Sequence, residues 1–194
     1  MTCLQSTIIS AFVTAFADHF HTDSILICQD MFDSVNISIT DKMANVVAPE
    51  DLGSALRHRK SDRSILVLCQ VSSLPDQDFG NEEGTMVFLL NKDKAITEGS
   101  WPWLRLDSML FVFDLCSQQT GTVTIDEAYR VKAGPLKRSP FATWEQENGL
   151  TIPEPNIWER RRDLNGLELV NSYLTWKPFT FDDGNGTLIG GGPG

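Results

Sequence analysis

Continuous apolar runs dominate the hydrophobic pattern in the first half of the chain. Two of them, at Ser24–Gln29 and Ser64–Gln70, are near copies of each other, S-I-L-I-C-Q and S-I-L-V-L-C-Q. Strands that are covered on both faces are continuously hydrophobic, as in parallel sheets that lie between helices. Both runs therefore predict central strands of a parallel sheet.

A helix is predicted before the first of these strands. Apolar residues recur every four positions from Ile8 to Phe20, which places them along one face of a helix. Residues 15–17 also have the small-x-small form of a signal-peptide cleavage site, although residues 1–7 carry no lysine or arginine. We favour a helix of the fold, and a signal peptide stays open as the alternative.

Two further elements are predicted between the central strands. Residues Val35–Ile39 alternate between apolar and polar types, which is typical of a strand. Pro49, followed by Glu50 and Asp51, is a favourable start for a helix, because proline suits the first turn and acids suit the positive end of the helix dipole. The order helix, strand, strand, helix, strand is typical of an α/β sheet with right-handed crossovers.

The second half of the chain is richer in β-type segments. Residues 85–90 predict a strand or a short helix, and residues 103–107 and 109–113 predict one broken strand or two adjacent strands. Residues 122–125 predict another strand, and residues 127–132 alternate like a half-exposed one. The chain is therefore predicted to be α/β, with a mostly parallel sheet flanked by helices and with β hairpins late in the sequence.

The net charge of the chain limits the classes of partner that it can be expected to bind. The 194 residues carry a formal net charge of −10, which argues against binding to nucleic acid or to an anionic membrane surface. Arg160–Arg162 is the basic run, and Glu159 and Asp163 flank it. Because such neighbours can pair locally and stay hydrated, this run predicts a hinge or linker.

The four cysteines, Cys3, Cys28, Cys69 and Cys116, have no C-x-x-C spacing. Three of them end an apolar run, which favours an interpretation as small buried hydrophobic residues. A disulfide between two neighbouring strand ends is the alternative if the chain is secreted, and the sequence does not assign the pair.

The sequence has few candidate residues for catalysis or for binding a metal or a cofactor. No G-x-S-x-G elbow occurs, and His19 and His21 would lie about 200° apart on the predicted helix, so they could not chelate one ion together. Residues 184–190 nearly match a dinucleotide loop, but the third glycine comes one residue late and Pro193 blocks a following helix. We therefore expect no catalytic residues, no metal and no cofactor, and we expect a free glycine-rich tail.

Two N-x-[S/T] sequences, at Asn36 and Asn185, are candidate glycosylation sites, with plain polar turns as the alternative.

Several segments near the carboxyl end carry a family resemblance. R-R-R-D-L-N-G-L-E-L at 160–169 is followed by W-K-P-F-T-F at 176–181, and W-E-Q-E-N-G-L stands upstream at 144–150. In this order they resemble arthropod chemosensory ionotropic receptors, which are variant relatives of ionotropic glutamate receptors. Residues 106–111 and 126–131 are similar to two earlier segments of that family.

The resemblance implies a domain organisation. Residues 1–158 would form an amino-terminal domain of the periplasmic-binding-protein-like type, and residues 159–166 the linker. Residues 167–194 would be the first strand of a ligand-binding domain and a flexible glycine-rich tail, with the rest of that truncated second domain expected beyond Gly194. Phe179, the aromatic residue after Pro178, would line the ligand cleft of that domain; packing into a core is the alternative.

The resemblance also implies a function. The chain would be the extracellular amino-terminal region of a ligand-gated cation channel subunit at the plasma membrane, and would contribute to subunit assembly and ligand sensing. Its partners would be other ionotropic receptor subunits and a small-molecule odorant or tastant. It would reach the membrane only through segments outside this chain, because no run here has the ~20 apolar residues of a spanning helix. The alternative is a soluble α/β small-molecule-binding protein or a cytosolic enzyme.

Overall fold

The chain divides into two compact units, Met1–Leu164 and Asn165–Gly194, in a computed structural model. The residues that the structure describes are 6–31, 43–57, 64–74, 86–91, 96–97, 99–114, 122–132, 134–152, 156–164, 166, 180–182, 185 and 188–191.

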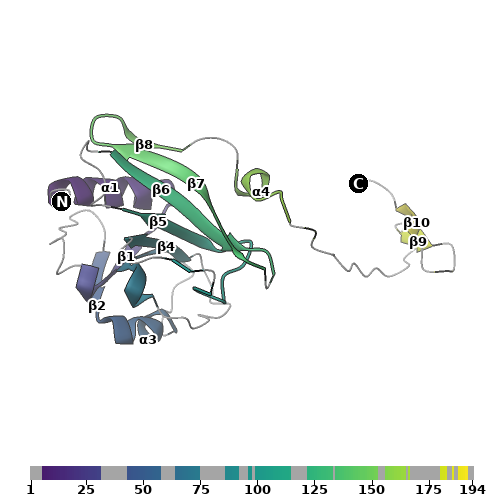
Figure 1. Ribbon diagram of the computed structural model, residues 1–194, viewed down its shortest axis with the longest axis horizontal. Helices are drawn as coiled ribbons and strands as arrows, with labels where there is room; N and C mark the ends of the chain where they lie inside the picture. The colour runs from purple at the N-terminus through teal and green to yellow at the C-terminus, as the bar shows by residue number, and fades with distance from the viewer. Residues whose placement is uncertain are drawn as a thin grey trace. The chain divides into compact units, whose positions relative to one another are not determined.

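The first unit begins with helices and strands in alternation, continues with a run of strands and ends in the short helix α4 (Figure 1). Its elements are α1 (Ser6–His19), β1 (Ser24–Cys28), β2 (Met43–Val47), the 3-10 helix η1 (Pro49–Asp51), α3 (Leu52–Arg57), β3 (Ile65–Gln70), the 3-10 helix η2 (Val71–Ser73), β4 (Met86–Asn91), β5 (Met109–Phe113), β6 (Thr122–Arg130), β7 (Leu136–Glu145), β8 (Gly149–Thr151) and α4 (Ile157–Arg160).

One eight-stranded sheet organises this unit, in the order β2-β1-β3-β4-β5-β6-β7-β8. The strands from β2 to β5 are parallel to their neighbours, and β6, β7 and β8 continue the sheet with antiparallel pairing. The predicted α/β class, with a mostly parallel sheet and late hairpins, is confirmed.

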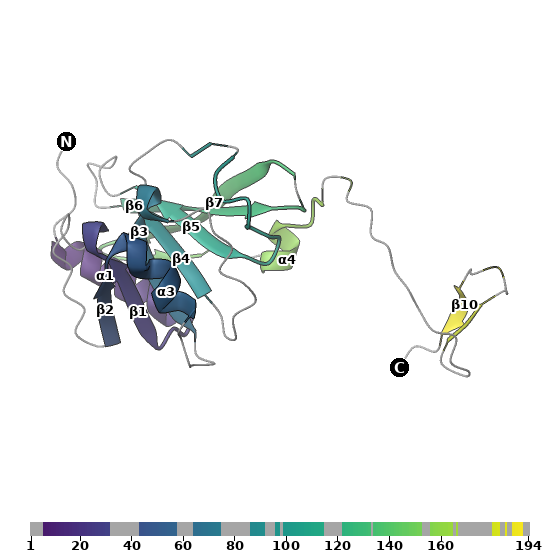
Figure 2. The same cartoon turned by 90° about the horizontal axis from the view of Figure 1, so that it is seen from below.

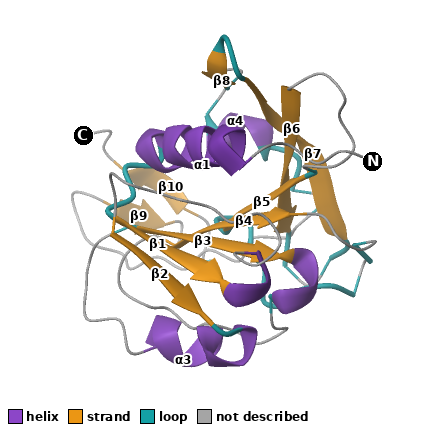
Figure 3. Cartoon of the chain, turned by 90° about the vertical axis from the view of Figure 1, so that its left-hand side faces the viewer, coloured by secondary structure: helices purple, strands orange, loops and turns teal. Residues whose placement is uncertain are grey.

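Each central strand buries both of its faces. Ile25 and Ile27 of β1 belong to a core under α1, whereas Leu26 and Cys28 belong to a second core with α3. Figure 3 shows α1 and α3 on opposite sides of the strands. This two-sided burial is why the sequence of β1 and β3 is continuously apolar rather than alternating.

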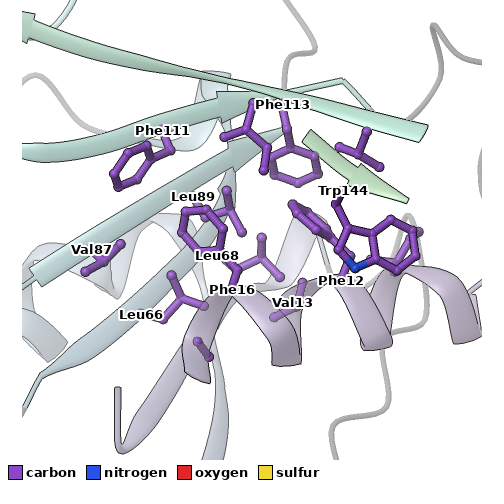
Figure 4. Packing of buried hydrophobic residues seen from close by; sticks show 14 of the residues in the cluster. Phe12, Val13, Phe16, Leu66, Leu68, Val87, Leu89, Phe111, Phe113 and Trp144 are labelled. Atoms are coloured by element: carbon purple, nitrogen blue, oxygen red, sulfur yellow. The ribbon is translucent and has the colours of Figure 1, made fainter. Parts of the chain in front are cut away.

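The helix α1 supplies much of the first core. Phe12 and Phe16 are fully buried, and the ring of Phe12 lies 5.1 Å from that of Phe113 and 5.8 Å from that of Trp144, between ring centroids. The ring of Phe16 lies 5.3 Å from that of Phe111 (Figure 4). The prediction of a fold helix is confirmed, because these residues are built into the core of the unit.

The late strands differ from the predicted ones. Residues 122–130 form the single strand β6, and residues 127–130 are buried, so the prediction of a half-exposed strand there is wrong. Both faces of β6 are covered there: Ala128 belongs to the core with α3, and Glu127 on the other face is covered by Arg160 and Arg161.

The pairing of β6 with β7 shifts register between Ile125 and Asp126, where β7 has an extra residue, Phe141. The partner strand β7 was not predicted, since it contains Pro140, which the ladder accommodates next to this irregularity.

The segment before β5 is a set of turns, so the strand predicted at residues 103–107 is wrong. Leu104 N–H donates to the Trp101 carbonyl at 3.1 Å and Ser108 N–H to the Arg105 carbonyl at 3.3 Å. Residues 86–91, in contrast, form a strand, which decides between the strand and the short helix that the sequence left open. The strand predicted at Val35–Ile39 lies outside the described residues.

The second unit contains an antiparallel pair, β9 (Thr180–Asp182) and β10 (Leu188–Gly191). Part of the expected free tail is therefore β10, because its backbone pairs with β9. The strand predicted at residues 167–170 lies outside the described residues. Among the helices that the structure describes, none has both the length and the apolar character needed to cross a membrane.

Candidate functional site

A buried carboxylate on β6 is the centre of the most connected polar cluster at the end of the first unit. The side chain of Glu127 is 0% exposed. Pairing of β6 with β7 places Glu127 opposite Ser139, whose hydroxyl donates to Glu127 Oε1 at 3.3 Å. Burying a carboxylate is costly unless cations and hydrogen-bond donors surround it, so this group indicates a specific arrangement around it.

The short helix α4 brings the required cations. Asn156 caps it: Asn156 Oδ1 accepts from the N–H of Trp158 at 3.0 Å and of Glu159 at 3.2 Å. Glu159 Oε2 accepts in return from the Asn156 N–H at 3.3 Å, which completes a capping box. This local structure fixes the direction in which the following arginines leave the helix.

Arg160 and Arg161 both donate to Glu127. Arg160 Nε and Nη2 contact the two carboxylate oxygens at 3.2 Å each, and Arg161 Nη2 contacts Oε2 at 3.1 Å. Arg161 Nη1 also donates to the Ser108 carbonyl at 2.9 Å and to the Leu106 carbonyl. We call Glu127, Arg160 and Arg161 the arginine anchor.

Aromatic rings complete the surroundings of the arginine anchor. The guanidinium of Arg161 lies over the ring of Tyr129, 4.6 Å from its centroid, and that of Arg160 lies 4.9 Å from the centroid of Phe141. A ring face attracts a cation, and more strongly where water is excluded. The anchor therefore holds the end of the unit by ion pairs, backbone contacts and ring contacts together.

The prediction that Arg160 and Arg161 pair with their neighbours in sequence and stay hydrated is wrong. The linker at residues 159–166 stays a prediction. The acids that flank these arginines in sequence have other partners: Glu159 belongs to the capping box, and Asp163 accepts from Lys137 Nζ at 2.9 Å. Arg162 alone of the three is exposed. The sequence concealed the true partner because Glu127 lies more than thirty residues away, 33 from Arg160.

Burial dominates the electrostatics of Arg161. It lowers the pKa of Arg161, and the neighbouring Glu127 carboxylate opposes that shift. An arginine starts so far above neutrality that Arg161 stays charged. Its Nε is buried without a hydrogen-bond partner among the described residues.

A second polar cluster lies at the carboxyl ends of the parallel strands. The order β2-β1-β3 makes the point between β1 and β3 a topological switch point, where open α/β sheets usually bind ligands. Met31, just after β1, is buried in the core under α1. Val71, just after β3, is buried in the core with α3 on the opposite face of the sheet.

Covalent and polar bridges span this switch point. Cys28 and Cys69 form a disulfide across β1 and β3, with their Cα atoms 4.9 Å apart. The Ser73 hydroxyl donates to Asp30 Oδ2, which also links the chain after β3 to the chain after β1. Between the next two strands, Asn91 Nδ2 at the end of β4 donates to Gln70 Oε1 at the end of β3 at 3.0 Å. The favoured interpretation of these two cysteines as merely buried hydrophobic residues is therefore incomplete, since they are buried and bonded to each other.

The described contacts tie the strand ends to one another. Asp30 accepts from the Ser73 hydroxyl and from the Met31 N–H, and Gln70 accepts from Asn91. Together with the disulfide, these contacts hold the carboxyl ends of β1, β3 and β4 in place.

The remaining predicted site residues are mostly not placed. Phe179 and Asn36 lie outside the described residues, as do Cys3 and Cys116, and Asn185 is exposed. No group of three or more metal-ligating side chains was found in the described part of the chain.

Comparison with known proteins does not identify a family: no family model matches the chain, and no curated protein or solved structure is significantly similar to it.

Proposed function

We propose that the chain is the extracellular amino-terminal region of a chemosensory ligand-gated cation channel subunit. The observation that carries the proposal is the disulfide between Cys28 and Cys69. Disulfides form and persist in oxidising compartments and are rare in the cytosol. The bond therefore favours the extracellular interpretation over a cytosolic enzyme, and the resemblance of residues 144–181 supplies the receptor family.

The sheet order supports a domain of the periplasmic-binding-protein-like type. A doubly wound sheet with covered faces, followed by antiparallel strands, is compatible with one lobe of such a domain. In the receptor, the second unit would begin the ligand-binding domain, with Phe179 at its cleft. Other receptor subunits and a small-molecule odorant or tastant would be its partners.

The arginine anchor gives the proposal a mechanical basis. In a receptor of this class, the segment after the amino-terminal domain connects it to the ligand-binding domain. Here Arg160 and Arg161 are tied to Glu127 of β6. The chain would therefore leave the first unit from a fixed point rather than from a loose hinge. A fixed exit transmits a displacement of the first unit to whatever follows, whereas a loose one would absorb it.

Surface labelling tests the proposal on the protein in its own cells. An antibody raised against the chain is applied to intact and to permeabilised cells that express it, and the membrane pellet is then washed with alkaline carbonate. We expect labelling of intact cells and retention of the antigen in the washed pellet. Labelling only after permeabilisation, with the antigen in the soluble fraction, would reject the receptor proposal and favour the cytosolic alternative.

A further inference from the structure

The connection between the last two described strands presents an exposed asparagine. β10, at the yellow end of the chain in Figure 2, pairs antiparallel with β9. Asn185 lies between these strands in sequence, at a bend in the backbone, and is exposed. The segment D-D-G-N-G-T at 182–187 has the composition of a turn. Asn185 takes no part in the pairing of the two strands, so a group attached to its side chain would leave that pairing intact.

Thr187 gives this asparagine the sequence of an acceptor for N-linked glycosylation. Such an acceptor needs a hydroxyl residue two positions after the asparagine and excludes proline between them. N-G-T meets both conditions, and Gly186 adds no side chain next to the amide. Asn148 is also exposed and is also followed by glycine, but Leu150 stands where the hydroxyl residue would be. A plain polar turn explains asparagine and glycine at both places; the hydroxyl distinguishes Asn185.

The disulfide is an independent argument for the compartment that this modification needs. N-linked oligosaccharides are added in the secretory pathway, where the oxidising lumen also allows disulfides to form and persist. The bond between Cys28 and Cys69 favours passage of the chain through that lumen. The inference therefore rests on the extracellular location in the proposed function, but it does not require the chain to be a receptor.

We propose that Asn185 carries an N-linked glycan. The donor is an oligosaccharide attached to a polyprenyl diphosphate. Asn185 Nδ2 forms a bond to the anomeric carbon of the first sugar while the bond from that carbon to the diphosphate oxygen breaks. Nδ2 loses one proton, and the lipid diphosphate leaves with the electron pair of the broken bond, so the transfer needs no oxidant or reductant.

The test uses the full chain, expressed in eukaryotic cells behind a cleavable secretion signal. This signal brings the chain to the modifying enzyme wherever the native protein resides. The secreted chain is treated with peptide-N-glycosidase in heavy-oxygen water, which converts a glycosylated asparagine into a labelled aspartate, and its peptides are analysed by mass spectrometry. We expect label at Asn185 and none at Asn148. Because Asn-Gly sequences also deamidate spontaneously, Asn148 measures that background.

Substitutions separate the acceptor sequence from the turn. Asn185→Gln and Thr187→Ala should each lose the glycosidase-sensitive shift in gel mobility that this site contributes. Thr187→Ser keeps the hydroxyl and should keep the shift. Asn36→Gln removes the other acceptor sequence, which lies outside the described residues, and should leave the label at Asn185 unchanged. Circular dichroism of each deglycosylated chain checks its folding.

The inference and the proposed function fail in different ways. An unlabelled Asn185 in the secreted chain, or equal label at Asn148, would overturn the inference and leave the extracellular proposal standing. Loss of the shift in Asn36→Gln alone would also overturn it. Label at Asn185 in the secreted chain, but none in protein isolated from its own cells, would overturn the native modification through the location of the protein and would count against the proposed function.

Discussion

At the scale of single residues, the arginine anchor shows how a charged run that looks like a linker becomes part of a core. Two cations share the Glu127 carboxylate, and the side chains of Arg161 and Glu127 are both 0% exposed. Removing one partner of a buried ion pair costs far more folding free energy than the intact pair contributes, because the remaining charge is left without water or a partner.

Glu127→Gln should therefore destabilise the first unit strongly. The amide keeps the shape of the side chain but leaves Arg160 and Arg161 without their countercharge, at an expected cost of about 3–5 kcal/mol. Urea unfolding followed by circular dichroism measures the loss. The matched control is Asp126→Asn on the same strand, whose partly exposed pair with Arg138 should contribute no more than about 1 kcal/mol. Equal losses in both variants would contradict the role of the anchor.

His19 at the end of α1 gives a pH-dependent prediction. Burial, then His21 and then Arg160 lower the pKa of His19 below its usual 6.5. The folded state therefore binds this proton less tightly than the unfolded state, so the contribution of His19 to stability is present above pH 6.5 and is lost as pH falls below it. NMR titration should find the His19 pKa below 6.5, and Arg160→Gln should raise it. A normal pKa in both proteins would contradict the predicted environment.

At the scale of elements, the sequence predicts the strands that are buried on both faces. It does not predict strands with an irregular pattern, or contacts between residues that are distant in sequence. The continuous runs at β1 and β3 were recognisable because each strand is covered on both faces. In contrast, β2 is a short edge strand with exposed residues, and β7 contains Pro140, so neither has the usual strand pattern. The arginine anchor could not be predicted for a different reason: Glu127, the partner of Arg160 and Arg161, is distant from both in sequence.

The disulfide joins the strands β1 and β3, and its contribution to the free energy of unfolding can be measured. It closes a loop with a sequence separation of 41 residues, for which loop-closure entropy predicts a stabilisation of about 4 kcal/mol. The double variant Cys28→Ala and Cys69→Ala should lose about that amount in guanidinium unfolding under oxidising conditions. A reducing agent should lower the stability of the original chain and leave the double variant unchanged; an effect of the reductant on both would point away from this bond.

At the scale of the whole molecule, the chain forms two units with a boundary after Leu164, and the anchor lies just before it. The receptor resemblance placed the end of the first domain at residue 158. Arg160 and Arg161, which follow that position, contact Glu127 of β6.

Limited proteolysis should report this arrangement directly. Trypsin should cleave first after Arg162, which is exposed, and more slowly after Arg160 and Arg161, whose side chains contact Glu127. Mass spectrometry of the early fragments distinguishes the three positions. Glu127→Gln should make cleavage at all three equally fast, whereas Asp126→Asn should preserve the order. Equal cleavage in the original chain would show that these arginines are not held.

The redox state of Cys28 and Cys69 in the native protein tests the proposed extracellular location most directly. Free thiols are alkylated in intact cells that express the chain, and the isolated protein is then digested without reduction and analysed by mass spectrometry. We predict that the peptide containing Cys28 is recovered bonded to the peptide containing Cys69, with neither cysteine alkylated. Recovery of both cysteines in alkylated form would mean that the protein resides in a reducing compartment, and would contradict the account.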